Sequence, residues 1–143
     1  MFTVDASVHI NSLNPAEEGS PESQAFLEHI YSRPCPVFSP TLLLVEVAAA
    51  IARVFDDPER GMAMAQAVQE LPGQVWVSLD EGLTQEAIWL AAKYRVRGAD
   101  AVYGAVARRY GATLVTQDRQ QLERLRSALP TLTPVEALAH ILQ

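Results

Sequence analysis

The chain has 143 residues, of which 49% are hydrophobic and 20% charged, and its formal net charge is −6. This size fits a single domain, which we expect to span residues 1–143. No stretch is apolar enough to span a membrane, the N-terminus lacks the basic start of a secretory signal, and one cysteine permits no internal disulfide. We therefore expect a cytoplasmic protein with no membrane partner.

Short apolar segments rich in β-branched residues alternate with helical periodicity, which is typical of an α/β protein. The predicted strands are residues 2–5, 37–39, 74–79 and 112–116. They are apolar enough to be buried on both faces, as the strands of a parallel sheet are. The predicted helices are near residues 22–32, 41–55, 58–70, 82–95, 100–110, 118–127 and 134–142.

Four dipeptides mark expected helix starts, because each places a capping side chain before a proline suited to the first helical turn. They are Ser20-Pro21, Ser39-Pro40, Asp57-Pro58 and Thr133-Pro134. The segment from Thr133 to Glu136 also has the pattern of a capping box.

Glu46 is the only charged residue between Leu42 and Ala52, a run so apolar that we expect its helix to be buried around nearly its whole circumference. An ionised carboxylate there is costly unless its pKa rises or a basic partner or cation lies near. Arg53, the nearest base, lies seven positions on, too far for a direct i,i+4 pair. Either Glu46 reaches water at the helix rim, or it belongs to a functional site.

Three other acids lie at the expected ends of elements. Asp5 closes the first strand, Asp100 lies at a helix start and Asp118 follows the strand that ends near Thr116. Residues beyond the carboxyl ends of parallel strands meet in one crevice, although Asp100 and Asp118 could instead be helix caps and Asp5 a turn residue. Four carboxylates gathered without a base would repel one another, and a divalent cation would resolve that conflict.

The available ligand types favour Mg²⁺ or Mn²⁺ over Zn²⁺, because the candidate donors are hard carboxylate oxygens. The three histidines, His9, His29 and His140, match no zinc spacing and are expected at the surface or in packing roles. Eight of the 11 basic residues follow residue 92, a distribution compatible with a phosphate-binding surface and equally with ordinary solvated helix faces.

The segments VDASV around Asp5, LLLVEVAAAI around Glu46, RGADAVYGAVA around Asp100 and LVTQD ending at Asp118 resemble the four motifs of PIN-domain ribonucleases. The resemblance is strongest to the VapC-type toxins of prokaryotic toxin–antitoxin pairs and covers roughly residues 2–122. It implies a PIN-like three-layer α/β/α fold with a short, mainly parallel central sheet.

The same resemblance implies that Asp5, Glu46, Asp100 and Asp118 form the catalytic metal site for Mg²⁺ or Mn²⁺. Ser7 and Thr116 match polar positions that support the metal or its water, although turn hydroxyls bonded to nearby backbone would look the same. We expect Arg97, Arg108 and Arg109, in the basic C-terminal third, to hold an RNA backbone.

The implied function is that of a metal-dependent endoribonuclease and toxin of a type II toxin–antitoxin system, with an antitoxin partner and a homodimer. The apolar helices near residues 41–70 offer surfaces for such partners, although packing into the core is the commoner use of such helices. Two alternatives stay open: a structure-specific metal-dependent DNA nuclease, and a catalytically inactive PIN-like RNA-binding module. A phosphatase of the haloacid dehalogenase kind is disfavoured, because its motif requires an acid where Ser7 stands.

Overall fold

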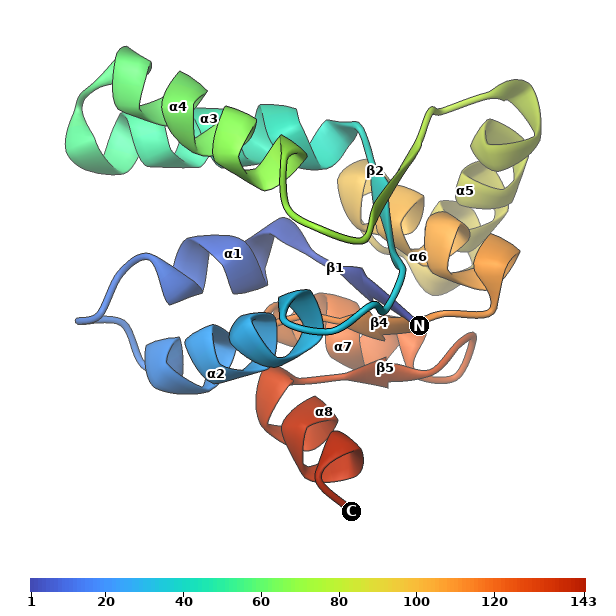
Figure 1. Ribbon diagram of the computed structural model, residues 1–143. Coiled ribbons are helices and arrows are strands. Elements are labelled where there is room, and N and C mark those ends of the chain that lie inside the picture. Colours follow the sequence, from blue (N-terminus) through green and yellow to red (C-terminus); the bar gives the residue numbers. More distant parts are fainter.

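The computed structural model describes residues 1–143, which form five strands and eight helices (Figure 1). The strands are β1 (Phe2–Val4), β2 (Val37–Pro40), β3 (Gln74–Val77), β4 (Thr113–Val115) and β5 (Thr131–Leu132). The helices are α1 (Ala6–Ser12), α2 (Ser20–Tyr31), α3 (Leu42–Phe55), α4 (Pro58–Gln69), α5 (Glu81–Tyr94), α6 (Gly98–Tyr110), α7 (Arg119–Leu125) and α8 (Pro134–Ile141). None of these helices combines the length and the apolar character needed to cross a membrane.

All five strands belong to one parallel sheet with the order β3-β2-β1-β4-β5. The chain moves outward from β1 to β2 and β3, and then returns to the opposite side of β1 to form β4. This reversal puts a topological switch point at the carboxyl ends of β1 and β4, where open parallel sheets bind ligands. The backbone N–H of Asp5 joins the two ends by donating to the carbonyl oxygen of Val115, at 2.9 Å.

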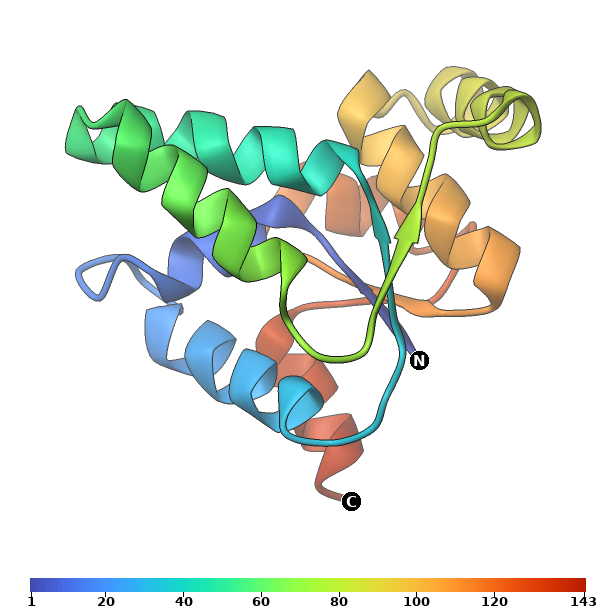
Figure 2. The ribbon, with the colours of Figure 1, turned by 45° about the horizontal axis from the view of Figure 1, so that its top comes forward.

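Helices cover both faces of the sheet, which confirms the predicted three-layer α/β/α arrangement. The larger core includes Leu90 of α5, Tyr103 of α6 and Leu125 of α7. A smaller core on the other face packs Phe26 of α2 and Ala137 of α8 against the sheet. Figures 1 and 2 show α2 and α8 on the side of the sheet away from α5 and α6.

The helices α3 and α4 form a hairpin that extends beyond the sheet (Figures 1 and 2). They pack closely at Gly61, where an added Cβ would lie 2.5 Å from the carbonyl oxygen of Ala48. The expectation that the helix around Glu46 is buried on nearly all sides is wrong, because Val45 on that helix is 65% exposed. The hairpin has one face against the body of the protein and another in solvent.

Two of the four expected capping sites are confirmed. Asp57 accepts hydrogen bonds from two backbone N–H groups at the start of α4, and Thr133 forms the predicted capping box at the start of α8. The other two predictions are wrong: Ser39 lies within β2, and α2 begins at Ser20 itself after Gly19, which has a φ of 86°.

Candidate active site

The four acids that the sequence singles out all line one cavity of about 460 Å³, at the carboxyl ends of β1 and β4. Asp5 follows β1 and caps α1, while Asp118 follows β4 and caps α7. Glu46 comes from the early part of α3, and Asp100 from the first turn of α6. Four separate elements therefore deliver one carboxylate each to the same space.

The two capping acids use one carboxylate oxygen each for the cap. Oδ2 of Asp5 accepts from the N–H of Ser7 at 3.0 Å, and Oδ1 of Asp118 accepts from the N–H of Gln121 at 2.9 Å. The cap fixes each side chain at its helix start and leaves a second oxygen for other partners. The capping role and a role in the site are therefore compatible for these two residues.

Burial makes ionisation of the two inner acids costly. Asp5 is 6% exposed, and this burial is the main cause that raises its pKa to about 6. Hydrogen bonds from Ser7 lower the pKa of Asp5, whereas the charges of Glu46 and Asp100 raise it further. Burial also raises the pKa of Asp100, against the opposing effect of Arg97. Asp5 and Asp100, rather than Glu46, are thus the protected members of the set.

Two bases share the cavity with the acids, in contrast to the expectation of a cluster without a base. Nε of Arg97 donates to Oδ2 of Asp100 at 3.1 Å, and its guanidinium also donates to Oδ2 of Asp118. The side chain of Arg97 is 65% exposed, so it bridges the two acids from the solvent side. Arg53 also lines the cavity but forms no ion pair with Glu46, as the sequence spacing predicts.

The donor set fits a hard divalent cation, because the cavity presents carboxylate oxygens and neither thiol nor imidazole. Asp5 and Asp100 also carry a burial cost that a nearby positive charge would relieve. As the side chains lie, no three His, Cys, Asp or Glu residues are grouped closely enough to hold a metal ion. Arg97 supplies positive charge to Asp100 and Asp118 in this arrangement.

A hydroxyl that the sequence did not single out contacts Glu46. Tyr103 of α6 is fully buried, and its O–H donates to Oε1 of Glu46 at 2.6 Å. Burial, and then the charges of Asp5 and Glu46, raise the pKa of the Tyr103 phenol, so that it remains a donor at neutral pH. Its spacing of three residues from Asp100 places both side chains on one side of α6.

The predicted supporting residues hold the backbone that carries Asp118. Oγ1 of Thr116 accepts from the N–H of Asp118 at 2.9 Å, and Oγ of Ser7 accepts from the N–H of Gln117 at 3.0 Å. The two hydroxyl oxygens lie 3.3 Å apart. Ser7 lines the cavity, whereas Thr116 is fully buried and does not line it. The Thr116 bond is a local turn bond, whereas the Ser7 bond joins α1 to the turn after β4.

The side chain of Gln117 fastens the same turn to α1 and α2. Its Nε2 donates to Oδ1 of Asn11 at 3.1 Å and to Oγ of Ser23 at 2.9 Å. Both of these partners are buried. Gly19 has no Cβ at this point, and an added one would lie 2.9 Å from Nε2 of Gln117. The loop between α1 and α2 is therefore packed against the end of β4.

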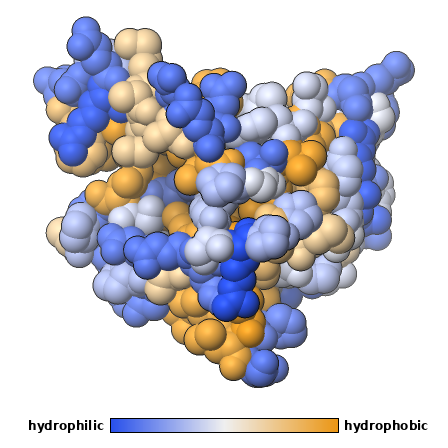
Figure 3. Space-filling view, viewed as in Figure 1, coloured by the Kyte–Doolittle hydropathy of each residue, from blue (hydrophilic) through white to orange (hydrophobic).

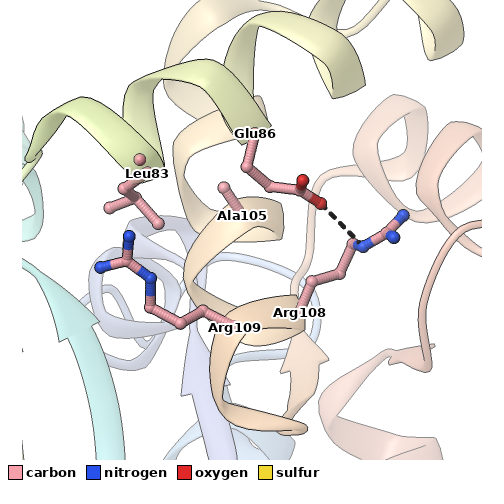
Figure 4. Close-up of a pocket in the computed structure, with 6 residues that line it drawn as sticks. Leu83, Glu86, Ala105, Arg108 and Arg109 are labelled. Carbon is pink, nitrogen blue, oxygen red and sulfur yellow. Dashed lines mark ion pairs between the residues drawn. The ribbon is translucent and has the colours of Figure 1, made fainter.

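The other two arginines proposed for RNA contact lie at the far end of α6, eight and nine residues after Asp100, or about 12 Å along the helix axis. Figure 4 shows them beside a separate cavity of about 340 Å³ between α5 and α6. Arg108 pairs with Glu86 at 2.9 Å, and Arg109 makes two bonds of 2.9 Å to Asp80. The structure therefore brings Arg97 to the acids, but not Arg108 or Arg109.

Comparison with known proteins assigns this arrangement to a family. Residues 2–127 match the model of the PIN domain, so the chain belongs to the PIN domain family, a family of nucleases. The predicted family membership and the PIN-like fold are therefore confirmed. No curated protein sequence matches the chain significantly.

Several solved structures share the fold. FitAcB from Neisseria gonorrhoeae has 15% identity, with 94% of this chain and 99% of that chain covered and a TM-score of 0.70. VapC20 of Mycobacterium tuberculosis, a sarcin-ricin loop cleaving toxin, has 19% identity, coverage of 85% and 92%, and a TM-score of 0.69. A toxin–antitoxin complex from Klebsiella pneumoniae has 16% identity, coverage of 94% and 98%, and a TM-score of 0.67.

Proposed function

We propose that this protein is a Mg²⁺- or Mn²⁺-dependent endoribonuclease. The observation that carries the proposal is the meeting of Asp5, Glu46, Asp100 and Asp118 around one cavity at the switch point of the sheet. Membership in a nuclease family and the likeness to a toxin that cleaves the sarcin-ricin loop support it.

In this proposal Asp5, Glu46 and Asp118 hold the cation directly or through water, and Asp100 is a further ligand or orients the attacking water. When bound, such a cation activates water as a nucleophile and offsets the charge that develops on the phosphate oxygens. Arg97 leaves the acids once their charge is balanced, and its exposed guanidinium then contacts the RNA backbone. Arg53 lines the same cavity and offers a second contact of this kind.

The chemistry is hydrolysis of a phosphodiester by water, so no 2′-hydroxyl is needed as nucleophile. Water adds to phosphorus, the bond to the 3′ oxygen breaks, and that oxygen takes up a proton. The products are a 5′-phosphate and a 3′-hydroxyl. A cyclic phosphate among the products would contradict this mechanism.

A cleavage assay tests the proposal. The protein is incubated with a panel of cellular RNAs in Mg²⁺ or Mn²⁺ and in EDTA, alongside Glu46→Gln, Asp118→Asn and the control Glu123→Gln. Glu123 is exposed on α7 and lies outside the cavity, so its variant should cleave like the wild type. Cleavage that persists in EDTA and in both site variants would refute the metal site.

The same assay separates the alternatives when matched RNA and DNA substrates are compared. Cleavage of RNA alone supports the proposal, and cleavage of structured DNA alone would favour the DNA nuclease. RNA that is bound but not cleaved at any cation concentration would favour the inactive RNA-binding module.

We further propose that the protein is the toxin of a type II toxin–antitoxin pair and forms a homodimer. The similar structure from Klebsiella pneumoniae is a toxin–antitoxin complex. Apolar side chains on the α3–α4 hairpin, Val45, Val54 and Met62, are each more than half exposed and offer a docking surface. Figure 3 shows this hairpin overhanging the body, with hydrophilic and weakly hydrophobic residues mixed on the visible face, and a more hydrophobic area over α8.

Light scattering on the purified protein and co-purification with the product of the adjacent reading frame test these two partners. A dimer mass and a stoichiometric complex that no longer cleaves RNA are the expected results. A monomer at micromolar concentration would contradict the homodimer, and an uninhibited nuclease would contradict the antitoxin.

A further inference from the structure

The bond between Tyr103 and Glu46 joins two helices that are far apart in sequence. The two residues are separated by 57 positions, and the hydroxyl lies 2.6 Å from Oε1. This distance is typical of a short O–H···O⁻ bond, in which the charge of the carboxylate strengthens the interaction. In both ribbon views the first turns of α6 lie next to the first turns of α3 (Figures 1 and 2).

The donor and the acceptor of this bond differ in the conformational freedom of their side chains. Tyr103 is fully buried in the larger core, so the position of its hydroxyl is fixed by packing. Glu46 lies on a helix with an exposed face and has a long side chain that loses rotamer freedom when it is held. The fixed hydroxyl of Tyr103 therefore orients the flexible carboxylate of Glu46.

We propose that Tyr103 is a positioning residue for Glu46. Its hydroxyl holds Oε1 and leaves Oε2 free to act in the cavity that Glu46 lines. This inference rests on the proposed function, because it assigns Oε2 to the cation. The helix α6 then has two tasks: Asp100 supplies a carboxylate, and Tyr103 orients the carboxylate of another helix.

A purely structural role for Tyr103 makes a different prediction. If the hydroxyl only tied α6 to α3, its removal would lower the free energy of unfolding. Any effect of that removal on cation affinity would then be the same with Glu46 present or replaced. If it acts through Glu46, its effect on cation affinity should vanish once Glu46 has lost its charge. A double-mutant cycle separates these two cases.

The test is an isothermal titration of the full chain with Mn²⁺ alone, for the wild type, Tyr103→Phe, Glu46→Gln and the double variant. Phe keeps the ring and fills the same core space, and thermal unfolding checks that each variant is folded. Tyr110→Phe is the matched control, because Tyr110 lies on the same helix but stacks on Phe38, with 4.3 Å between ring centroids.

We expect Tyr103→Phe to weaken Mn²⁺ binding about tenfold or more, as loss of a residue that orients a ligand does. We expect no further loss when Tyr103→Phe is added to Glu46→Gln, and no change in Tyr110→Phe. Unchanged affinity in Tyr103→Phe, with binding still weakened by Glu46→Gln, would overturn the positioning role alone. The positioning role would also be overturned if Tyr103→Phe weakened Mn²⁺ binding equally in the wild type and in the Glu46→Gln background. A wild type that binds no Mn²⁺ would overturn both the positioning role and the proposed function.

Discussion

Replacing Asp5 by Asn should stabilise the cation-free protein at neutral pH. Burial is the main cause that raises the pKa of Asp5 from 3.8 to about 6, so the folded state holds this proton more tightly than the unfolded chain does. The stability contributed by a group of this kind is fully present below pH 3.8 and is lost as the pH rises through about 6. The difference between the two pKa values corresponds to about 3 kcal/mol at pH 7.

Asn cannot ionise, and its side-chain oxygen can still accept the N–H of Ser7 and cap α1. The free energy of unfolding of Asp5→Asn should therefore exceed that of the wild type by up to about 3 kcal/mol at pH 7. This gap should shrink towards zero near pH 4. In Mn²⁺ the order should reverse, because the proposed cation site of the wild type is intact and ligand binding stabilises the folded state.

Urea unfolding in EDTA at several pH values between 4 and 8 measures the gap. Asp57→Asn is the matched control, because Asp57 caps α4 in the same way but is exposed. It should show no comparable gap that grows with pH. If Asp5→Asn is no more stable than the wild type at pH 7, or if its advantage is constant with pH, the burial cost assigned to Asp5 is wrong.

Three further variants test other parts of the structure. Arg97→Gln should weaken the binding of a short RNA by the cation-loaded protein and reduce the slope of log affinity against log salt by about 0.7. Fluorescence anisotropy measures both quantities. If the variant has the same affinity and the same slope as the wild type, Arg97 does not contact a phosphate. Gly61→Ala would place a Cβ 2.5 Å from the carbonyl oxygen of Ala48 and should lower the free energy of unfolding by about 1–3 kcal/mol. An unchanged midpoint of urea unfolding would contradict the close packing of α3 and α4. Thr133→Ala removes the capping box of α8 and should lower the free energy of unfolding by about 1 kcal/mol without altering Mn²⁺ affinity. A change in Mn²⁺ affinity would contradict the separation of this cap from the acidic cavity.

The meeting of the acids was predictable because it depends on topology that local patterns indicate. Asp5 directly follows β1 and Asp118 lies three residues after the end of β4, and a parallel sheet brings the ends of such strands to one edge. Two elements were not predictable in this way. The helix α1 has only seven residues, and β5 has only two residues. Both depend on tertiary contacts rather than on local sequence.

The surroundings of Glu46 were harder to predict, because they depend on how helices pack. The run around Glu46 is apolar throughout, but the sequence does not tell which of its faces meets the core, and Val45 faces solvent. Tyr103 lies in another apolar helix and gives no local sign that its hydroxyl meets a carboxylate on α3. Helix spacing correctly predicts that Arg53 makes no direct ion pair with Glu46, but it does not predict that both residues line one cavity.

The most direct test of the proposed metal site is the binding of Mn²⁺ itself, followed by electron paramagnetic resonance of the free ion. The wild type and Glu123→Gln should deplete free Mn²⁺ equally, whereas Asp100→Asn and Asp118→Asn should bind it much more weakly. Equal binding by all four proteins, or none by the wild type, would contradict a cation site built from these acids.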